Sequence, residues 1–352
     1  MYIIVAIIAF GILIAVHEAG HFSAAKLLEV RVNEFAIGMG PKLIKKQGRE
    51  TLYSLRVLPL GGFCALEGEN GDSDDARSFN MQKRWKRVII LAAGSVANML
   101  LGFIIVIILV SGTKSFTGTT ITEFAQGFPN EGASGLMLGD TLVSINGERL
   151  YYANDFLLFM QIYDSGKIDL VIKRGGEAIK LIDFPMMRRE YTKDGKTDLR
   201  FGITLNSIEG NAWERLKYSC YSAYNYIRLV RVSLAQLIRG GVGVGELSGP
   251  VGIISAMNDV GRSSSTAFEA IASIASFTAI IGINIAIMNL LPIPALDGGR
   301  ILFIFITWFI EKVIRRRVDP KYEGYIHSAT MVLLMGLMIF ILINDVVKIV
   351  SG

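Results

Sequence analysis

Two histidines and a glutamate near the start of the chain have the types and spacing of a catalytic metal site. His17, Glu18 and His21 form the motif H-E-x-x-H. In a helix the two imidazoles lie on one face, four residues apart, with the carboxylate beside them, an arrangement that binds zinc and activates water. The sixteen residues before His17 carry no charge. Because ionisable groups at membrane depth are costly and are usually kept for a function, the motif predicts metal-dependent hydrolysis inside a bilayer.

A third metal ligand is predicted at Asp297, far along the sequence. It lies in NLLPIPALDGG (residues 289–299), where two prolines and a glycine pair oppose a regular helix. Taken alone, Asp297 could equally cap a helix. Two histidines, one carboxylate and one open position make a catalytic rather than a structural zinc site. We therefore expect His17, His21 and Asp297 to hold Zn²⁺, with Glu18 as the general base.

Four apolar segments are expected to carry these residues across a membrane. Hydrophobic residues make up 51% of the chain and charged residues only 19%, which is more apolar than an ordinary soluble domain. A helix needs about 20 residues to cross the hydrocarbon core. We predict transmembrane helices at residues 1–28, 88–110, 268–296 and 326–348, so that the first helix carries the H-E-x-x-H motif and the third ends next to Asp297.

Basic residues predict which side of the membrane each connection occupies. Lys and Arg are frequent in residues 29–87 and in the loop before the fourth helix, and the positive-inside rule assigns both segments to the cytoplasm. The chain termini and residues 111–266 are then extracytoplasmic, and the predicted metal site lies near the cytoplasmic leaflet. These clusters also account for the net charge of +5, so the charge does not require a nucleic-acid partner.

Five motifs together resemble the bacterial site-2 proteases, intramembrane zinc metalloproteases of the RseP type. They are HEAGH (17–21), GMGPKL (38–43), LPLGGF (58–63), LSGPVGI (247–253) and LDG (296–298). Each motif alone is weak, but their shared order along nearly the whole chain is specific. The resemblance implies an α-helical polytopic membrane protein of about four transmembrane helices, with a re-entrant β-hairpin in residues 29–87 and an inserted extracytoplasmic domain.

Residues 111–207 are expected to form that inserted α+β domain. The run SGLMLGDTLVSINGERL (134–150) resembles the PDZ signature, in which a GD pair leads into a strand and an NG turn. A single PDZ domain is implied, with a peptide as its ligand. Residues 208–266 are expected to follow as an amphipathic helix and a connector that contains LSGPVGI, and residues 267–352 to complete the protease core begun by residues 1–110.

The resemblance also implies residues that bind substrate. The family pattern N-x-x-P-x-P-x-L-D-G falls on Asn289 and Pro292, and Asn289 is expected to hold an unwound substrate backbone or the developing oxyanion. Its simpler role would be to satisfy backbone groups freed by the prolines. Residues 51–65, with Gly61 and Gly62, resemble the family's re-entrant β-hairpin, whose edge can pair with an extended substrate.

The function implied by the resemblance is that of a zinc endopeptidase in the cell membrane. Its implied substrates are single-pass membrane proteins, such as anti-sigma factors already trimmed by another protease, or signal-peptide remnants. Two other classes of function compete. A zinc or ion transporter would also use broken helices, but it predicts paired repeats, and neither motif recurs. A catalytically silent PDZ scaffold predicts loss of the general base or of a ligand, and all four residues are present.

Overall fold

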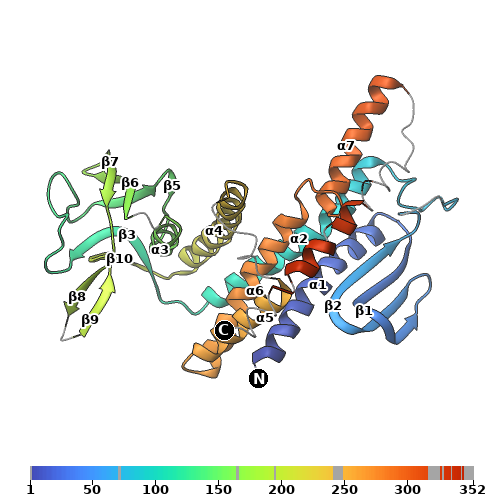
Figure 1. Cartoon of the computed structure of the whole chain (residues 1–352), viewed down its shortest axis with the longest axis horizontal. Helices are drawn as coiled ribbons and strands as arrows, with labels where there is room; N and C mark the ends of the chain where they lie inside the picture. The colour runs from blue at the N-terminus through green and yellow to red at the C-terminus, as the bar shows by residue number, and fades with distance from the viewer. Residues whose placement is uncertain are drawn as a thin grey trace. The chain divides into compact units, whose positions relative to one another are not determined.

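The computed structural model describes residues 2–69, 73–163, 166–193, 196–240 and 249–315, together with scattered positions between 326 and 344. The chain separates into two compact units (Figure 1). One combines Met1–Leu109 with Tyr226–Gly352 and is called the membrane unit below. The other, Val110–Asn225, is called the inserted unit.

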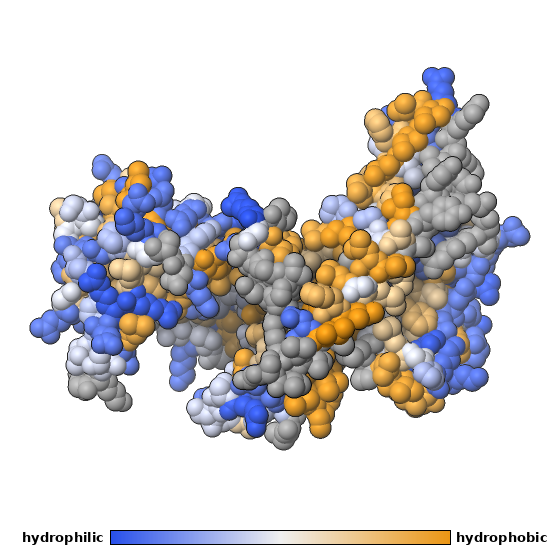
Figure 2. Space-filling model, in the orientation of Figure 1, coloured by the Kyte–Doolittle hydropathy of each residue, from blue (hydrophilic) through white to orange (hydrophobic). Residues whose placement is uncertain are grey.

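Three helices of the membrane unit are long and apolar enough to cross a membrane: α1 (Tyr2–Leu27), α2 (Arg84–Val110) and α6 (Ala267–Asn289). They correspond to the first three predicted spans. In the most apolar 18-residue stretch of each helix, only 17%, 33% and 39% of the residues, respectively, are buried within the protein. Hydrophobic side chains cover much of this unit's visible surface (Figure 2). This exposure of apolar side chains places the chain in a membrane. The predicted fourth span, residues 326–348, is only partly described, and its described positions include a shorter apolar helix, Ala329–Ile341.

Small residues bring the spanning helices into close contact. A methyl group on Gly20 of α1 would lie 2.4 Å from the carbonyl oxygen of Ala93 in α2, so only glycine permits this approach. Gly102 of α2 packs in a similar way on α6, where a methyl group would lie 3.0 Å from the carbonyl oxygen of Ala279. Because lipid tails are as apolar as leucine, helices in a membrane associate through such close packing rather than through hydrophobic burial.

The third span ends earlier than predicted, at Asn289 instead of residue 296. Residues 290–296 form a loop, since the prolines in it cannot continue the helix. The loop folds back onto the start of the next helix, where a methyl group on Gly298 would lie 2.2 Å from the carbonyl oxygen of Leu290. The glycine pair is therefore needed for this return of the chain.

Two helices occupy segments where connections were expected. α5 (Pro250–Ser263) lies in the predicted connector and packs its Met257 against α1. Leu247 and Ser248, the first residues of the LSGPVGI motif, lie outside the described residues. α7 (Asp297–Ile314) replaces the first part of the predicted basic loop. It forms because no proline or glycine interrupts the sequence after the glycine pair; within its apolar run ILFIFITWFI, Ile304 is buried whereas Phe305 and Phe309 are exposed.

Strands β1 (Val32–Gln47) and β2 (Leu52–Leu66) form an antiparallel hairpin beside α1 (Figure 1). The hairpin predicted for residues 51–65 is therefore only the second arm of a longer one. Both strands bend, so that Leu55 pairs with Ile37 on one side and with Ile44 on the other. As a result, residues 62–66 pair with the start of β1 and form an outer edge of this sheet.

The inserted unit contains an antiparallel sheet in the order β10-β3-β4-β6-β7, with β5 paired to β4. Its strands are β3 (Ser115–Phe124), β4 (Thr141–Ile145), β5 (Glu148–Arg149), β6 (Lys167–Arg174), β7 (Glu177–Pro185) and β10 (Ile203–Glu209). Strands β8 (Arg189–Lys193) and β9 (Lys196–Arg200) form a separate hairpin. The predicted NG turn is present at Asn146 and Gly147, which both have positive φ and join β4 to β5.

Two helices complete the inserted unit, α3 (Ala153–Ile162) and the first half of α4 (Ala212–Ile238). The α4 helix covers the segment predicted to be an amphipathic helix. The hydroxyl of Tyr152 at the start of α3 donates a hydrogen bond of 2.6 Å to Glu214 of α4. The rings of Tyr151 and Tyr221 stack with their centroids 3.9 Å apart. Aromatic contacts thus fasten the start of α4 to α3.

Candidate metal centre

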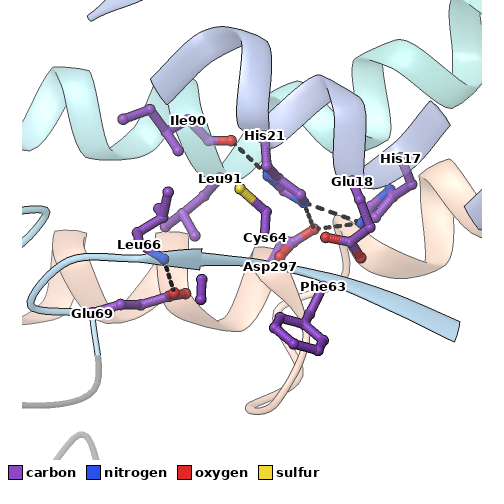
Figure 3. Close-up of a pocket in the computed structure, with 11 residues that line it drawn as sticks. His17, Glu18, His21, Phe63, Cys64, Leu66, Glu69, Ile90, Leu91 and Asp297 are labelled. Carbon is purple, nitrogen blue, oxygen red and sulfur yellow. Dashed lines mark hydrogen bonds and ion pairs between the residues drawn. The ribbon is translucent and has the colours of Figure 1, made fainter. Parts of the chain in front are cut away.

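Three side chains of metal-ligand type converge where α1 meets the first turn of α7 (Figure 3). Nε2 of His17 and Nε2 of His21 lie 3.2 Å apart, and each lies 3.3 Å from Oδ2 of Asp297. Both histidines are buried and the aspartate is largely buried. The structure therefore brings together the three residues that the sequence predicted as ligands.

The spacing of these three atoms fits one zinc ion. Ligand atoms at about 2.0–2.1 Å in a tetrahedral zinc site are separated by about 3.3–3.4 Å, close to the 3.2 and 3.3 Å found here. Among the described residues, Oδ2 of Asp297 has no hydrogen bond of standard geometry although it is buried. An unpaired buried carboxylate oxygen is costly, and a cation at the shared point would satisfy it.

The ring of His21 is held in the orientation that metal binding requires. Its Nδ1 donates a hydrogen bond of 2.8 Å to the carbonyl oxygen of Ile90 in α2. A proton on Nδ1 leaves the lone pair of Nε2 free for a metal ion. The partner is a backbone carbonyl of a packed helix, so the tautomer does not depend on a mobile side chain.

Glu18 lies in the same cavity, beside the outer edge of β2 (Figure 3). The cavity has a volume of about 500 Å³. Its lining consists of His17, Glu18, His21, Asp297, Phe63, Cys64, Ala65, Leu66, Glu69, Ile90 and Leu91. A methyl group on Gly62 would lie 3.2 Å from Cγ of Glu18, so the strand passes close to this side chain. A carboxylate in this place can accept a proton from a water held by the neighbouring ligands.

An ion pair at the edge of the cavity ties β2 to α7. The carboxylate of Glu69 pairs with Arg300 and also accepts a hydrogen bond of 3.3 Å from the amide of Leu66. Arg300 follows Asp297 by one helical turn. Because both residues belong to the start of α7, the pair helps to fix the position of Asp297 relative to the β2 edge. Neither partner of this ion pair was predicted from the sequence as a site residue.

Gly94 of α2 was also missed, yet it makes room for both histidines. A methyl group on it would lie 2.3 Å from Nε2 of His21 and 2.8 Å from Cε1 of His17. The signal in the sequence was the run AAGS (residues 92–95), a patch of small residues within a strongly apolar helix. Such patches mark places where another helix comes close.

The four residues predicted to bind substrate lie at different distances from the candidate metal centre. Asn289 ends α6, and its side-chain nitrogen lies 3.3 Å from Nε2 of His17. Gly62 lies beside the glutamate of the motif. None of the four is among the residues that line the cavity; Gly61, with φ of +95°, faces Met39, and Pro292 lies in the loop after α6. The structure thus brings Asn289 and Gly62 to the centre but not the other two.

Comparisons with known proteins identify the family of the chain. The family described as "Peptidase family M50" matches residues 5–337, which include every residue of the centre. A protein of Clostridium acetobutylicum named "Putative zinc metalloprotease" is 36% identical over 346 residues, covering 98% of this chain and 97% of the relative. A protein of the same name from Clostridium perfringens is 33% identical over 351 residues and covers 99% of each chain.

A third relative carries a more specific name. "Regulator of sigma-W protease RasP" of Bacillus subtilis is 26% identical over 427 residues and covers 98% of each chain. Across all three relatives the alignment runs through both halves of the membrane unit and the inserted unit between them. The chain therefore belongs to peptidase family M50, the site-2 protease family, and is a zinc-dependent metalloendopeptidase of the membrane.

Proposed function

We propose that this chain cleaves single-pass membrane proteins within or near their transmembrane segments. One observation carries the proposal: the cavity that contains Glu18 and the three ligand-type side chains is built on α1 and α2, which are apolar enough to span a membrane. Ionisable residues at membrane depth are costly and are usually kept for a function there. A substrate that already lies in the bilayer explains the placement.

Each residue of the proposed centre has a proposed role. His17, His21 and Asp297 are the zinc ligands. When bound, zinc would lower the pKa of a water to about 7 and polarise the scissile carbonyl. Glu18 accepts the proton of that water and passes it to the leaving amine. Asn289, whose amide lies next to His17, holds the substrate backbone or stabilises the oxyanion.

The substrate is proposed to bind as a strand. A helix engages its carbonyl groups in internal hydrogen bonds, so the peptide must unwind before attack. Residues 62–66 have ladder partners on one side only, in residues 32–37, and four of them line the cavity. An unwound peptide can add to this edge through main-chain hydrogen bonds. Gly62 lets the added strand approach Glu18, while Pro292 keeps the loop after Asn289 from extending the helix.

The proposed natural substrates are anti-sigma factors that another protease has first trimmed, and signal-peptide remnants. The name of the Bacillus subtilis relative, which refers to sigma-W, supports this class. The proposed site lies near the cytoplasmic leaflet. Lys83, Arg84, Lys86 and Arg87 stand at the start of α2, and His21 contacts Ile90 just beyond them. Basic residues at a helix end favour the cytoplasmic side.

We further propose that the inserted unit is a single extracytoplasmic PDZ domain with a peptide ligand. Its support is the antiparallel sheet with the NG turn between β4 and β5, and β10 at one edge of that sheet, where a peptide can add. Such a domain would exclude substrates with large extracytoplasmic parts. The proposed domain boundaries are 1–110 and 267–352 for the protease core, 111–207 for the PDZ domain, and 208–266 for the helix and connector.

Substitution of the proposed general base tests the function. Purified protein in zinc-containing liposomes would be mixed with a tagged single-pass membrane protein. Glu18→Gln keeps the shape of the side chain but cannot accept a proton, so cleavage is expected to slow by about 10²–10⁴-fold while zinc stays bound. The matched control is Glu29→Gln, at an exposed residue just after α1, which is expected to cut at the wild-type rate.

Two results would refute the proposal. Undiminished cleavage by Glu18→Gln would remove this residue from the mechanism. Mass spectrometry of the products locates the cut bond, and cleavage confined to a soluble part of the substrate would contradict a membrane substrate.

A further inference from the structure

The two histidines of the centre differ at their second ring nitrogen. Nδ1 of His21 donates to the carbonyl oxygen of Ile90. Nδ1 of His17 is buried and has no hydrogen-bond partner in the described part of the chain. A histidine that binds a metal through one nitrogen nearly always donates the other N–H to an oxygen, which fixes its tautomer and its direction. His17 therefore lacks the acceptor that its proposed role requires.

An unpaired acceptor is available on the facing helix. Asn98 of α2 is 0% exposed, and neither its Oδ1 nor its Nδ2 has a partner among the residues that the structure describes. A buried amide without hydrogen bonds is costly in any protein and more so within a membrane helix. Neither helix packing nor the proposed catalytic steps account for an asparagine at this position.

The register of α1 against α2 places Asn98 on the face of α2 that meets His17, one helical turn beyond it. The two helices run in opposite directions, since His21 contacts Ile90 while Cε1 of His17 would meet a methyl group on Gly94 at 2.8 Å. Asn98 follows Gly94 by four residues, one turn along the same face of α2. Cε1 of His17 touches the face of α2 that carries Gly94 and Asn98. The unpaired Nδ1 of His17 is bonded to this Cε1 atom and so lies close to the same face.

Contacts with α6 place Asn98 from the other side. A methyl group on Gly282 would lie 2.8 Å from Cδ2 of Leu13 and 3.6 Å from the carbonyl oxygen of Asn98. Leu13 precedes His17 by one turn of α1. Asn98 therefore lies near the level of Leu13, one turn of α1 from His17, where α1, α2 and α6 meet and no solvent reaches it.

We propose that Asn98 is the positioning residue for His17. Its amide oxygen accepts the Nδ1 proton of His17, after a rotation of the Asn98 side chain, and thereby presents Nε2 to the metal. The carbonyl oxygen of Ile90 does the same for His21, so α2 supplies one oxygen to each histidine. This inference rests on the proposed zinc centre.

Zinc affinity tests the proposal without reference to activity. The purified full chain in detergent would be titrated with zinc against a chromogenic chelator. Asn98→Leu keeps the size of the side chain but removes the acceptor, and it is expected to weaken zinc binding about 10–100-fold. Asn98→Asp restores an acceptor oxygen and is expected to bind zinc at least as tightly as the wild type.

Ser95→Ala is the matched control. Ser95 is also 0% exposed with an unpaired hydroxyl on α2 in the described structure, but it is turned about 100° from Gly94 around the helix. Its loss is expected to leave zinc affinity unchanged. Equal zinc affinity of Asn98→Leu and wild type would overturn the proposal, whereas a wild type that binds no zinc would instead overturn the metal centre itself.

A second measurement separates positioning from a structural role. In the zinc-free state, Asn98→Leu is expected to unfold at a temperature no lower than the wild type, because leucine removes an unpaired polar group. Should that variant fail to fold, the zinc affinities of Asn98→Ala and Asn98→Asp are compared instead, and equal affinities would overturn the proposal. ¹⁵N spectra of histidine-labelled wild type check which ring nitrogens bind the metal. Loaded with zinc, His17 and His21 are both expected to be Nδ1–H tautomers, and an Nε2–H tautomer at His17 would overturn the proposal.

Discussion

In the inserted unit the buried carboxylate of Asp140 has both oxygens hydrogen-bonded, whereas in the membrane unit Asp297 keeps one oxygen unpaired. Arg174 donates to Asp140 through Nε at 2.8 Å and Nη2 at 2.7 Å, and the amide of Met137 adds a third bond. Oδ2 of Asp297 instead lies 3.3 Å from two imidazole nitrogens without a hydrogen bond of standard geometry. The difference separates a carboxylate that stabilises a fold from one arranged to bind a cation.

The largest expected effect is at the unpaired carboxylate. Changes to residues that support a metal ligand typically weaken metal binding about 10–100-fold. Asp297→Ala removes a ligand itself and should weaken zinc binding by more than this. Since the aspartate starts α7 and its oxygen takes part in no standard hydrogen bond, the protein should still fold. Zinc content after dialysis and circular dichroism would be measured together. Zinc occupancy equal to that of the wild type would remove Asp297 from the centre.

The next effect is expected where α2 approaches the histidines. Gly94→Ala places a methyl group 2.3 Å from Nε2 of His21, so the imidazole must move and zinc affinity should fall by about tenfold or more. Gly102→Ala is a matched control, because its methyl group meets Ile283 at 2.7 Å, away from the cavity. Both variants overpack a helix contact and should lose about 1–3 kcal/mol of stability. Equal zinc affinity in the two would contradict the assigned role of Gly94.

Substitution of the paired carboxylate, Asp140, should have the opposite result: the inserted unit becomes less stable and the zinc affinity does not change. Asp140→Asn removes the partner of Arg174 and should destabilise the inserted unit by about 3 kcal/mol, since breaking a buried pair leaves an uncompensated charge. Lys180→Gln, which breaks an exposed pair with Asp169, should cost no more than about 0.5 kcal/mol. Hydrogen exchange of residues 110–225 measures both variants. A loss of zinc in Asp140→Asn would break the contrast between the two carboxylates.

The smallest expected effect is a loss of stability of the inserted unit in acid, caused by protonation of Asp140. Burial alone would raise the pKa of Asp140, but the Arg174 guanidinium and the amide of Met137 outweigh it and hold the pKa below its ordinary value. Its stabilising effect is therefore complete above the unfolded pKa of about 3.9 and is lost as the pH falls through the lower folded pKa. Hydrogen exchange from pH 6 to pH 3 should show this loss in the wild type and a shallower one in Asp140→Asn.

The sequence predicted the residues that meet in the cavity because their types are rare in apolar segments. H-E-x-x-H is a local pattern on one helix, and Asp297 was the carboxylate expected at the same depth. Gly94 and Asn98 could not be found in this way, since their significance depends on how α1 packs on α2. A glycine among small residues and an asparagine in a long helix have no spacing that identifies a partner.

The extent of the elements was also only partly predictable. The alternating pattern of residues 51–65 indicated a strand, but its partner, residues 32–47, has no comparable alternation and includes a proline and two glycines. The start of α7 was taken for a loop because basic residues follow it, although its own first part is apolar. Tertiary contacts decided both cases, since β1 forms by pairing with β2 and the start of α7 packs against the loop that follows α6.

X-ray absorption at the zinc edge tests the central claim most directly, because it reports the atoms bound to the metal. The zinc-loaded wild type is expected to show two imidazole nitrogens and low-Z oxygen neighbours at about 2.0–2.2 Å, with no sulfur. Cys64 lines the same cavity and supplies the contrast. A sulfur neighbour at about 2.3 Å, or a spectrum unchanged by Asp297→Ala, would contradict a centre formed by His17, His21 and Asp297.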